Sequence, residues 1–426
     1  MRRIAALSLL SALLLAILAG CGRGMGDQVA PNKATVINAA LTESTADPAD
    51  VAAVAASLSS FATDLYQKIS AEQHGKANVF LSPASIEQVL VLMLAATDGQ
   101  THQQLLDVLN LDLPDSRLYP AVKAFWTDLA EGDYTFENAN WGVVRDTVPL
   151  HPDYVSLVSE HLGAEFRNDS FADPQALASQ INDAVSERTN GMIKELVNAG
   201  MMADPQLFLV LLNAVYFKGD WVDPFTAGTS DSPFITWDGT TRSVTMMSRL
   251  QVTSYVKGDG YTAVELPYKG EASMLLVLPD HGRFDEISGS LTAQRLSQIR
   301  AQLRSAKNPK AELRVPKFSF TTDEAVNLKS SISALGAPGL FSGSFDWAPL
   351  QAKPGEQVEV GFLVHKAAIK VDEKGTEAAG ATAGGVRSVS APPNPPITFD
   401  RPFVVTIQDT KHDAVLFIGR IGDPRQ

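Results

Sequence analysis

The sequence predicts an α+β fold with a single domain over residues 51–426, and three observations support this prediction. The 426 residues are 45% hydrophobic and 19% charged, which is typical of a globular protein and excludes disorder of the whole chain. Apolar residues with helical spacing dominate the N-terminal part, whereas short strand-like runs dominate after about residue 207. The sequence shows no internal repeat. Helices followed by strands favour one compact α+β unit.

Residues 1–20 predict an export signal that is separate from the fold. A short basic start precedes an apolar run over residues 4–20, which is the pattern of a signal peptide. The run ends at Leu18-Ala19-Gly20-Cys21, which resembles the bacterial lipobox and implies that Cys21 becomes the lipidated first residue of the exported protein. The lipid would anchor the protein to the bacterial cell envelope, with its bulk outside the cytoplasm. The alternatives are an uncleaved membrane anchor and an ordinary buried cysteine.

Composition and motifs narrow the classes of function. Cys21 is the only cysteine, which excludes an internal disulfide and a cysteine-based zinc cluster. The formal net charge of −13 argues against nucleic acid as a partner, because a basic face is needed to bind phosphates. After residue 20, no stretch approaches the ~20 apolar residues of a membrane-spanning helix. Signatures of α/β-hydrolases, zinc proteases and nucleotide-binding enzymes are absent, so we expect neither an enzyme nor a bound metal or cofactor.

The N-terminal elements of the domain follow from helix signals. Residues 21–50 are mostly small or polar and predict a flexible tether behind the lipid. Asp47-Pro48, near the end of this tether, is a typical helix start, and apolar residues at helical spacing continue to Ile69. After a short strand-like run at 78–81, a second helix should begin at Ser82-Pro83 and stop at Gly99.

The later elements are mainly strands. Residues 100–170 and 175–200 mix helical patterns with short strand patterns. Residues 207–217 are almost wholly apolar but too short to span a membrane, so they predict a strand that is buried on both faces. Further strand-like segments lie at 232–256, 261–267, 273–279, 311–320, 364–372, 402–408 and 414–420.

Residues 373–401 interrupt this series of strands. They contain no large apolar side chain before Ile397, and a connection of this length without structure is usually functional or disordered. In the first half, Glu377 and Arg387 lie on one face of an extended chain. The opposite face carries no charge and consists of Thr376, Ala378, Gly380, Thr382, Gly384 and Val386. A period of two suits a segment that becomes a strand with one side on a core, whereas the alternative is a low-complexity surface loop.

Five motifs resemble those of the serpin family and stand in the family's order. Residues 372–382 resemble the hinge of the serpin reactive-centre loop. The other motifs lie at 78–86, at 213–221 with Pro224-Phe225, at 315–318 with Asn327-Leu328, and at 400–403 with 416–420. The resemblance covers about residues 56–424. It departs from the family at Ala184, where tryptophan is frequent, and at 391–396, where four prolines lengthen the segment before the next strand.

The resemblance implies both a fold and a function. In the serpin fold, N-terminal helices pack on a large central β-sheet with smaller sheets beside it, and a reactive-centre loop stays exposed. Serpins are monomeric suicide inhibitors of serine or cysteine endopeptidases with a metastable native state. The target cuts the loop, and the loop inserts as a new central strand while the protease is attached as an acyl-enzyme; serpins are the general example of this strand addition. The small hinge residues favour inhibition over the alternative, a non-inhibitory serpin that acts as a binding protein.

The resemblance also assigns roles to individual residues. It implies a loop hinge at Glu373, Gly375, Thr376, Ala378, Ala379, Gly380, Ala381 and Thr382. It implies a shutter, where strands of the central sheet must part, at Ser82, Ser85, Asn213 and His365. The breach, where the loop enters the sheet, is implied at Trp221. Without the resemblance, each shutter side chain would be interpreted as a partner of nearby backbone groups.

The scissile bond is expected near the end of the loop. The family's usual loop length places it at Val389-Ser390, which suits an elastase-like or subtilisin-like protease, because those enzymes have small apolar pockets. The alternative bond is Arg387-Ser388, which suits a trypsin-like protease. The two assignments differ by two residues and imply different partners.

Overall fold

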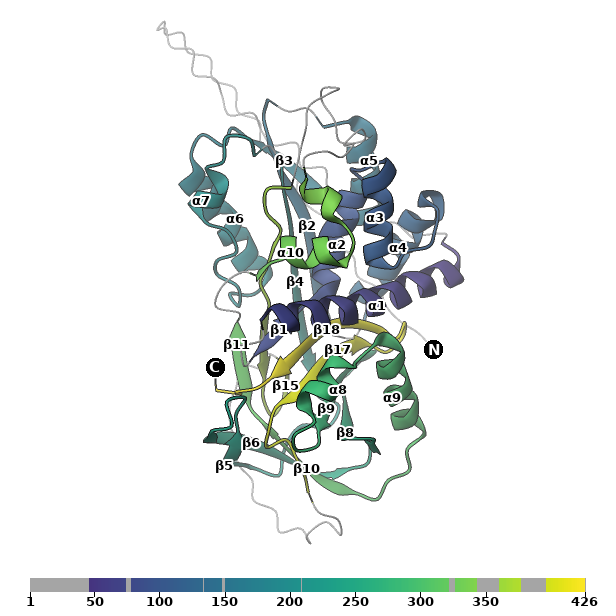
Figure 1. The fold of residues 1–426 in the computed structure, drawn as a ribbon, viewed down its shortest axis with the longest axis vertical. Coiled ribbons are helices and arrows are strands. Elements are labelled where there is room, and N and C mark those ends of the chain that lie inside the picture. The colour runs from purple at the N-terminus through teal and green to yellow at the C-terminus, as the bar shows by residue number, and fades with distance from the viewer. Residues whose placement is uncertain are drawn as a thin grey trace, which may run out of the picture. The chain divides into compact units, whose positions relative to one another are not determined.

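The computed structural model describes residues 46–73, 78–132, 134–147, 150–207, 209–321, 326–342, 360–376 and 396–425 (Figure 1). All of these residues belong to one unit of the chain, Thr35–Gln426. The predicted signal peptide, Cys21 and all but the end of the predicted tether lie outside the described residues, so these predictions remain untested.

Capping residues and prolines start the N-terminal helices. The Asp47 carboxylate accepts a 2.9 Å hydrogen bond from a first-turn N–H, and Pro48 takes the first helical position. Ser82 caps the second helix in the same way, so both predicted helix starts are confirmed. Gly99 instead begins the third helix, with a left-handed φ of 57° that redirects the chain between two helices. The helices are α1 (Pro48–Glu72), α2 (Pro83–Leu94), α3 (Gly99–Leu109), α4 (Asp115–Ala130), α5 (Pro152–Leu162), α6 (Pro174–Arg188), α7 (Ala199–Met202), α8 (Phe284–Gly289), α9 (Ala293–Ser305) and α10 (Lys329–Leu335), with a 3₁₀ turn η1 (Pro338–Phe341).

A six-stranded sheet, here called the central sheet, has the order β11-β14-β15-β4-β2-β3. Its strands are β2 (Thr135–Arg145), β3 (Glu165–Asp169), β4 (Leu209–Asp220), β11 (Phe318–Thr321), β14 (Ala368–Val371) and β15 (Gly375–Thr376). β4 is the strand predicted at 207–217, and apolar side chains on both of its faces pack into cores. Val210 and Leu212 are buried against α6, whereas Leu209 and Leu211 on the other face are only half-buried.

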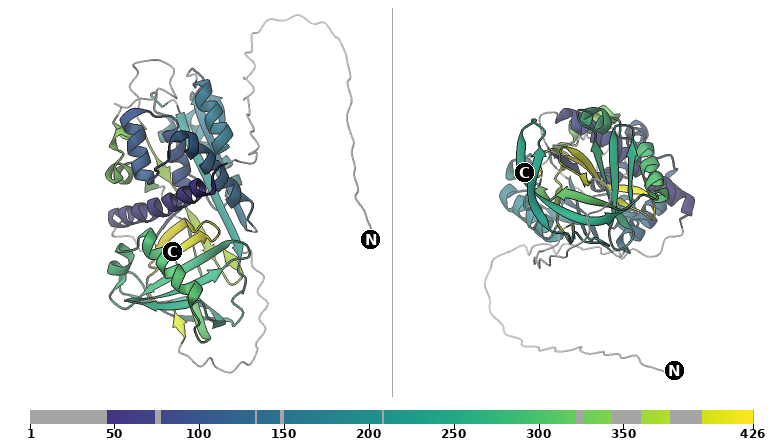
Figure 2. Two further views of the ribbon diagram at one scale, coloured as in Figure 1. Left: turned by 90° about the vertical axis from the view of Figure 1, so that its right-hand side faces the viewer. Right: turned by 90° about the horizontal axis from the view of Figure 1, so that it is seen from below.

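Other sheets and the helices pack beside the central sheet. A second six-stranded sheet has the order β1-β18-β17-β9-β8-β7, with β1 (Val79–Leu81), β7 (Tyr255–Gly258), β8 (Tyr261–Pro267), β9 (Ala272–Pro279), β17 (Phe403–Asp409) and β18 (Ala414–Ile421). A four-stranded sheet has the order β16-β10-β6-β5, with β5 (Thr229–Ile235), β6 (Thr241–Val252), β10 (Ala311–Pro316) and β16 (Ile397–Thr398). β12 (Val326–Asn327) pairs with β13 (Val364–His365). Figure 2 shows β17 and β18 in yellow next to α1 in purple, which agrees with their packing in the main core.

Three of the predicted strand-like segments contain more than one strand, and in residues 311–320 these are β10 and β11, which belong to different sheets. Residues 232–256 contain β5, β6 and β7, because Gly239 adopts a left-handed φ of 79° in the turn between β5 and β6. Residues 364–372 contain β13 and β14, which belong to different sheets. The helices packed on sheets confirm the α+β class predicted from the sequence. In the described part of the chain, none of the helices combines the length and apolarity that crossing a membrane requires.

Candidate functional site

The predicted loop begins as a short strand inside the central sheet. After β14, the chain turns back and Asp372 N–H donates to the Gly375 carbonyl at 3.0 Å. Gly375 then pairs with Asp220 on β4, and Thr376 pairs with Gly219. On its other side, Thr376 pairs with Val371 of β14. β15 therefore occupies the first two positions of a strand between β4 and β14.

Only glycine fits at position 375. A Cβ atom built on Gly375 would lie 2.0 Å from the Gly219 carbonyl oxygen and 2.9 Å from the Asp220 Cα. Both contacts involve backbone atoms, which cannot move aside without breaking the pairing of β15 with β4. The close approach of the two backbones explains why the chain enters the sheet at this residue.

Trp221 holds the turn that leads into β15. Its side chain is fully buried, and its indole N–H donates to the Asp372 carbonyl at 3.0 Å. Its backbone N–H donates to the Lys374 carbonyl at 2.8 Å, and the Phe225 N–H donates to the Glu373 carbonyl at 2.9 Å. Three successive carbonyls of the turn therefore accept hydrogen bonds from the segment 221–225.

Two further contacts fix the start of the loop. The Glu373 carboxylate forms an ion pair of 2.8 Å with the Lys317 ammonium. The Thr376 side chain is only 4% exposed, and its hydroxyl lies 2.5 Å from the Tyr268 hydroxyl. Tyr268 stacks on Trp221, with ring centroids 4.4 Å apart and an interplanar angle of 13°. Sequence reasoning missed Tyr268, because only the fold brings it near residues more than a hundred positions away.

A cavity of about 550 Å³ continues from Thr376 along the edge of β4. Within the described residues, β4 pairs with β2 over most of its length, but it pairs with β15 only at Gly219 and Asp220. Residues 360–369 line the opposite wall of this cavity without pairing to β4. The half-buried Leu209 and Leu211 face this space, which explains their exposure. Within the described residues, the central sheet thus contains an open strand position that continues from β15, between β4 and residues 360–369.

The four predicted shutter residues meet in the wall of this cavity. The Ser82 N–H donates to His365 Nε2 at 3.1 Å, and the Ser82 hydroxyl donates to the Leu416 carbonyl at 3.3 Å. The Ser85 N–H donates to the Ser82 hydroxyl at 3.3 Å, and the Ser85 hydroxyl donates to the Asn213 side-chain oxygen. The network links the first turn of α2 to β4, β13 and β18. Its polar atoms lie where an additional strand would pass.

His365 of this network and Glu87, which lies elsewhere on α2, are buried titratable groups. Burial lowers the pKa of His365 to about 4, and its Nε2 accepts a hydrogen bond, so the imidazole is neutral at pH 7. Glu87 lies on α2 and is 1% exposed, and neither carboxylate oxygen has a hydrogen-bond partner among the described residues. Burial raises the pKa of Glu87 to about 8. Sequence reasoning missed Glu87, although an acidic residue inside the apolar stretch of a predicted helix is a usable signal.

The rest of the predicted site lies outside the described residues. This applies to the hinge residues Ala378, Ala379, Gly380, Ala381 and Thr382. It applies equally to both candidate scissile bonds, Val389-Ser390 and Arg387-Ser388.

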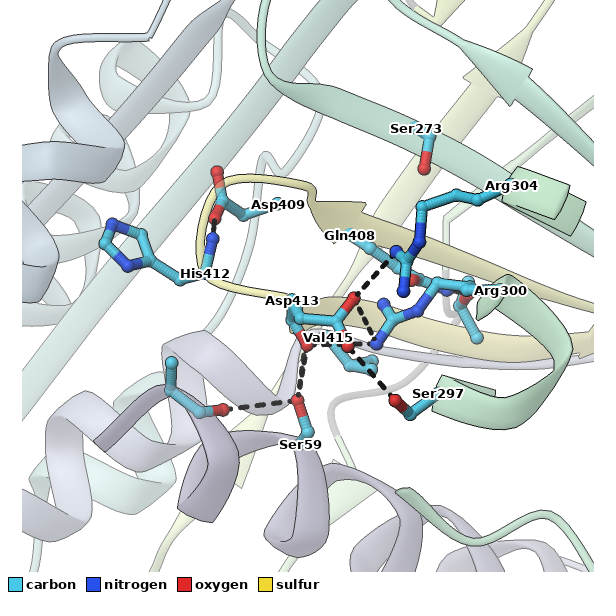
Figure 3. Close-up of polar contacts among 12 residues, drawn as sticks. Ser59, Ser273, Ser297, Arg300, Arg304, Gln408, Asp409, His412, Asp413 and Val415 are labelled. Carbon is cyan, nitrogen blue, oxygen red and sulfur yellow. Dashed lines mark hydrogen bonds and ion pairs between the residues drawn. The ribbon is translucent and has the colours of Figure 1, made fainter. Parts of the chain in front are cut away.

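A second polar cluster lies apart from the cavity and joins α1, α9 and the turn between β17 and β18 (Figure 3). Asp413 is its centre, and its carboxylate contacts Arg300 at 2.8 Å and accepts from the Ser297 hydroxyl at 3.3 Å. The Asp413 carbonyl accepts from the Ser59 hydroxyl at 3.2 Å and from Arg300 at 3.1 Å. Arg300 is 3% exposed, so the cluster is an internal tie between elements and contributes nothing to the cavity wall.

Comparison with known proteins adds to this geometry. The family model described as "Serpin (serine protease inhibitor)" matches residues 56–424. A serpin-like protein of Thermococcus kodakarensis is 32% identical over 378 residues, which cover 86% of this chain and 85% of that protein. Alpha-1-antitrypsin of Sus scrofa is 30% identical over 383 residues, which cover 88% of this chain and 87% of that protein. The native-state structure of the thermophilic serpin tengpin has the same fold, with a TM-score of 0.79 over 92% of this chain and 99% of that one, at 22% identity.

Proposed function

Because the chain belongs to the serpin family, we propose that it is an irreversible inhibitor of serine-type endopeptidases and not an enzyme. In this proposal, a target protease cuts the reactive-centre loop and is trapped when the cut loop inserts as a new strand of the central sheet. One observation supports this mechanism above all. β15 lies between β4 and β14 where the new strand would begin, and a cavity continues from it along an edge of β4 that has no pairing strand among the described residues.

The register of β15 supports insertion with small side chains inward. Gly375 and Thr376 pair with Asp220 and Gly219, so each further loop residue would pair with the preceding residue of β4. Residue 382 would lie opposite Asn213, and residue 386 would lie opposite the first residue of β4. The buried Thr376 side chain fixes which face points inward. Residues 378, 380, 382, 384 and 386 share that face, and all five are uncharged.

The driving force follows from the unpaired edge of β4. Each ladder hydrogen bond gained on insertion contributes about 0.5–1.5 kcal/mol net. The loop has to be cut before it can enter fully, so inhibition depends on a race between insertion and hydrolysis of the acyl-enzyme. The Ser85–Asn213 contact lies beside the route, and its hydrogen bonds would have to rearrange as the strand arrives.

The proposed bond is Val389-Ser390, with an elastase-like or subtilisin-like target, and Arg387-Ser388 with a trypsin-like target is the alternative. Both bonds follow residue 386, so either cut leaves enough loop to pair with the whole of β4. The mass of the C-terminal peptide released by each protease distinguishes them, because the two peptides differ by two residues.

A panel of serine proteases tests the function. The exported chain is incubated with elastase, subtilisin and trypsin and then run on a denaturing gel. A complex that survives denaturation is expected with at least one protease. Cleavage near residues 387–390 without a stable complex would contradict inhibition and favour the alternative, a non-inhibitory serpin that acts as a binding protein.

We also propose that the protein is a monomer, exported and lipid-anchored to the bacterial cell envelope through Cys21. This rests on the apolar run that ends at the only cysteine of the chain. Replacing Cys21→Ala is expected to release the protein from the membrane fraction. If the variant stays with the membrane as the wild type does, lipid at Cys21 is not the anchor.

A further inference from the structure

We propose that Tyr268 is a positioning residue, which holds Gly375 and Thr376 in the central sheet before any protease cuts the loop. The proposed contact is the hydroxyl pair between Tyr268 and Thr376 at the closed end of the cavity. Its effect on inhibition rests on the function proposed above. The contact itself can be tested in the intact protein without a protease.

The Tyr268 ring is fixed by contacts that do not involve the loop. It stacks on Trp221 at 4.4 Å and meets the edge of Phe217 at a centroid distance of 5.0 Å and an angle of 67°. Its backbone N–H donates to the Ala272 carbonyl at 3.0 Å. A Cβ atom on Gly219 would lie 2.6 Å from the ring, so this glycine of β4 makes room for it. The hydroxyl therefore keeps its place whether or not Thr376 is present.

Each of the two hydroxyls has the other as its hydrogen-bond partner within the described residues. Both side chains are buried: Tyr268 is 1% exposed, and Thr376 is 4% exposed. Burial raises the pKa of Tyr268, so its phenol stays protonated and can donate. If Thr376 left the sheet, the Tyr268 hydroxyl would lose its partner, which is unfavourable for a buried polar group.

Holding two residues in place matters because ordering a strand costs conformational entropy. Residues that are already paired do not have to be ordered after cleavage, so insertion starts from an existing nucleus. A faster start favours trapping over hydrolysis of the acyl-enzyme. Tyr268 is thus expected to affect the yield of trapped protease and to leave the first attack on the loop unchanged.

Hydrogen exchange in the uncut protein tests the contact. In Tyr268→Phe, the amides of Gly375 and Thr376 are expected to exchange about fivefold faster than in the wild type, which corresponds to the loss of one hydrogen bond. The matched control is Tyr66→Phe, because the Tyr66 hydroxyl pairs with the Ser288 hydroxyl at 2.7 Å in a buried site on α1. This control should leave the two amides unchanged.

Variants of Thr376 distinguish the effect of the Tyr268–Thr376 hydrogen bond from the effect of the Tyr268 ring. Thr376→Ser keeps a hydroxyl and should stay near the wild-type rate, whereas Thr376→Val should resemble Tyr268→Phe. The double variant Tyr268→Phe with Thr376→Val should exchange no faster than either single variant, because both remove the same bond. Unchanged exchange in Tyr268→Phe, or additive effects in the double variant, would overturn the proposal.

Inhibition provides the second measurement. With a protease that the wild type traps, Tyr268→Phe should need more inhibitor molecules per protease inactivated, at an unchanged association rate. A loss of association rate with an unchanged stoichiometry would contradict a positioning role. If the wild type traps no protease, the proposed function fails, and the exchange experiment still decides whether Tyr268 holds the loop.

Discussion

The entry and the middle of the proposed insertion route differ in how completely their polar groups are paired. At the entry, Trp221, Tyr268 and the β4 backbone hold residues 372–376 through main-chain and side-chain hydrogen bonds. In the middle, the polar network of Ser82, Ser85, Asn213 and His365 lines a cavity, and one edge of β4 has no pairing strand among the described residues. A new strand at this position would supply backbone partners to that edge.

This difference suggests that the two regions have different roles in the proposed insertion. A well-paired entry fixes the register in which a loop can insert. Under the proposed mechanism, an incompletely paired middle would leave the native state less stable than the form with the position filled. The predictions below test the entry and the interior of the fold separately.

The largest effect is expected from a charge at the entry. Thr376→Arg would place a guanidinium beside Tyr268 in a site that is 4% exposed, at a cost of several kcal/mol. The variant should lose stable complexes and be cleaved as an ordinary substrate on a denaturing gel. Thr253→Arg, at an exposed threonine, is the matched control and should inhibit normally. If Thr376→Arg still forms the complex, the entry does not govern insertion.

Glu87, which is buried on α2, gives the largest expected pH effect. Its pKa is about 8 in the fold and 4.5 in the unfolded chain, so the fold favours the protonated carboxyl. Unfolding releases a proton between these values, and stability should fall by at most about 5 kcal/mol as the pH rises from 4.5 to 8. Glu87→Met should remove this slope in urea unfolding at pH 5 and pH 8. The exposed control Glu187→Met should retain the pH dependence of stability. An unchanged pH dependence in Glu87→Met would show that Glu87 is not its cause.

His365 should produce the opposite slope over a lower range. Its pKa is about 4 in the fold and 6.5 in the unfolded chain, so the unfolded state binds the proton first. About 3 kcal/mol of stability is therefore lost as the pH falls from 6.5 to 4. His365→Gln should abolish this acid sensitivity, whereas His281→Gln, at an exposed histidine, should not. Equal acid sensitivity in the wild type and His365→Gln would show that another group is responsible.

The smallest effect is expected from one hydrogen bond at the entry. Trp221→Phe keeps an aromatic ring but leaves the Asp372 carbonyl without the indole donor, which should destabilise the intact protein by about 1–2 kcal/mol. Thermal unfolding of the intact chain measures this change. Trp126→Phe is the control, because the buried Trp126 donates no hydrogen bond within the described part of the chain. Similar losses of stability in both variants would indicate that the Trp221 side chain stabilises the protein through packing alone.

Much of the architecture could be predicted because local signals and motifs agree. The helix starts at Asp47 and Ser82 follow from capping chemistry, and the strand β4 follows from its apolar run. The meeting of Ser82, Ser85, Asn213 and His365 came from the resemblance, since no local pattern connects residues this far apart. Tyr268 and the two-residue strand β15 could not be predicted, because both depend on the approach of distant backbones.

The Asp413 cluster has a mechanical consequence for the proposed insertion. It fastens two helices to one hairpin through a buried arginine, and none of its residues lines the cavity that the loop would enter. Under the proposed insertion, the contacts among Ser59, Arg300 and Asp413 would keep α1, α9 and the turn between β17 and β18 together while the strands beside the cavity part.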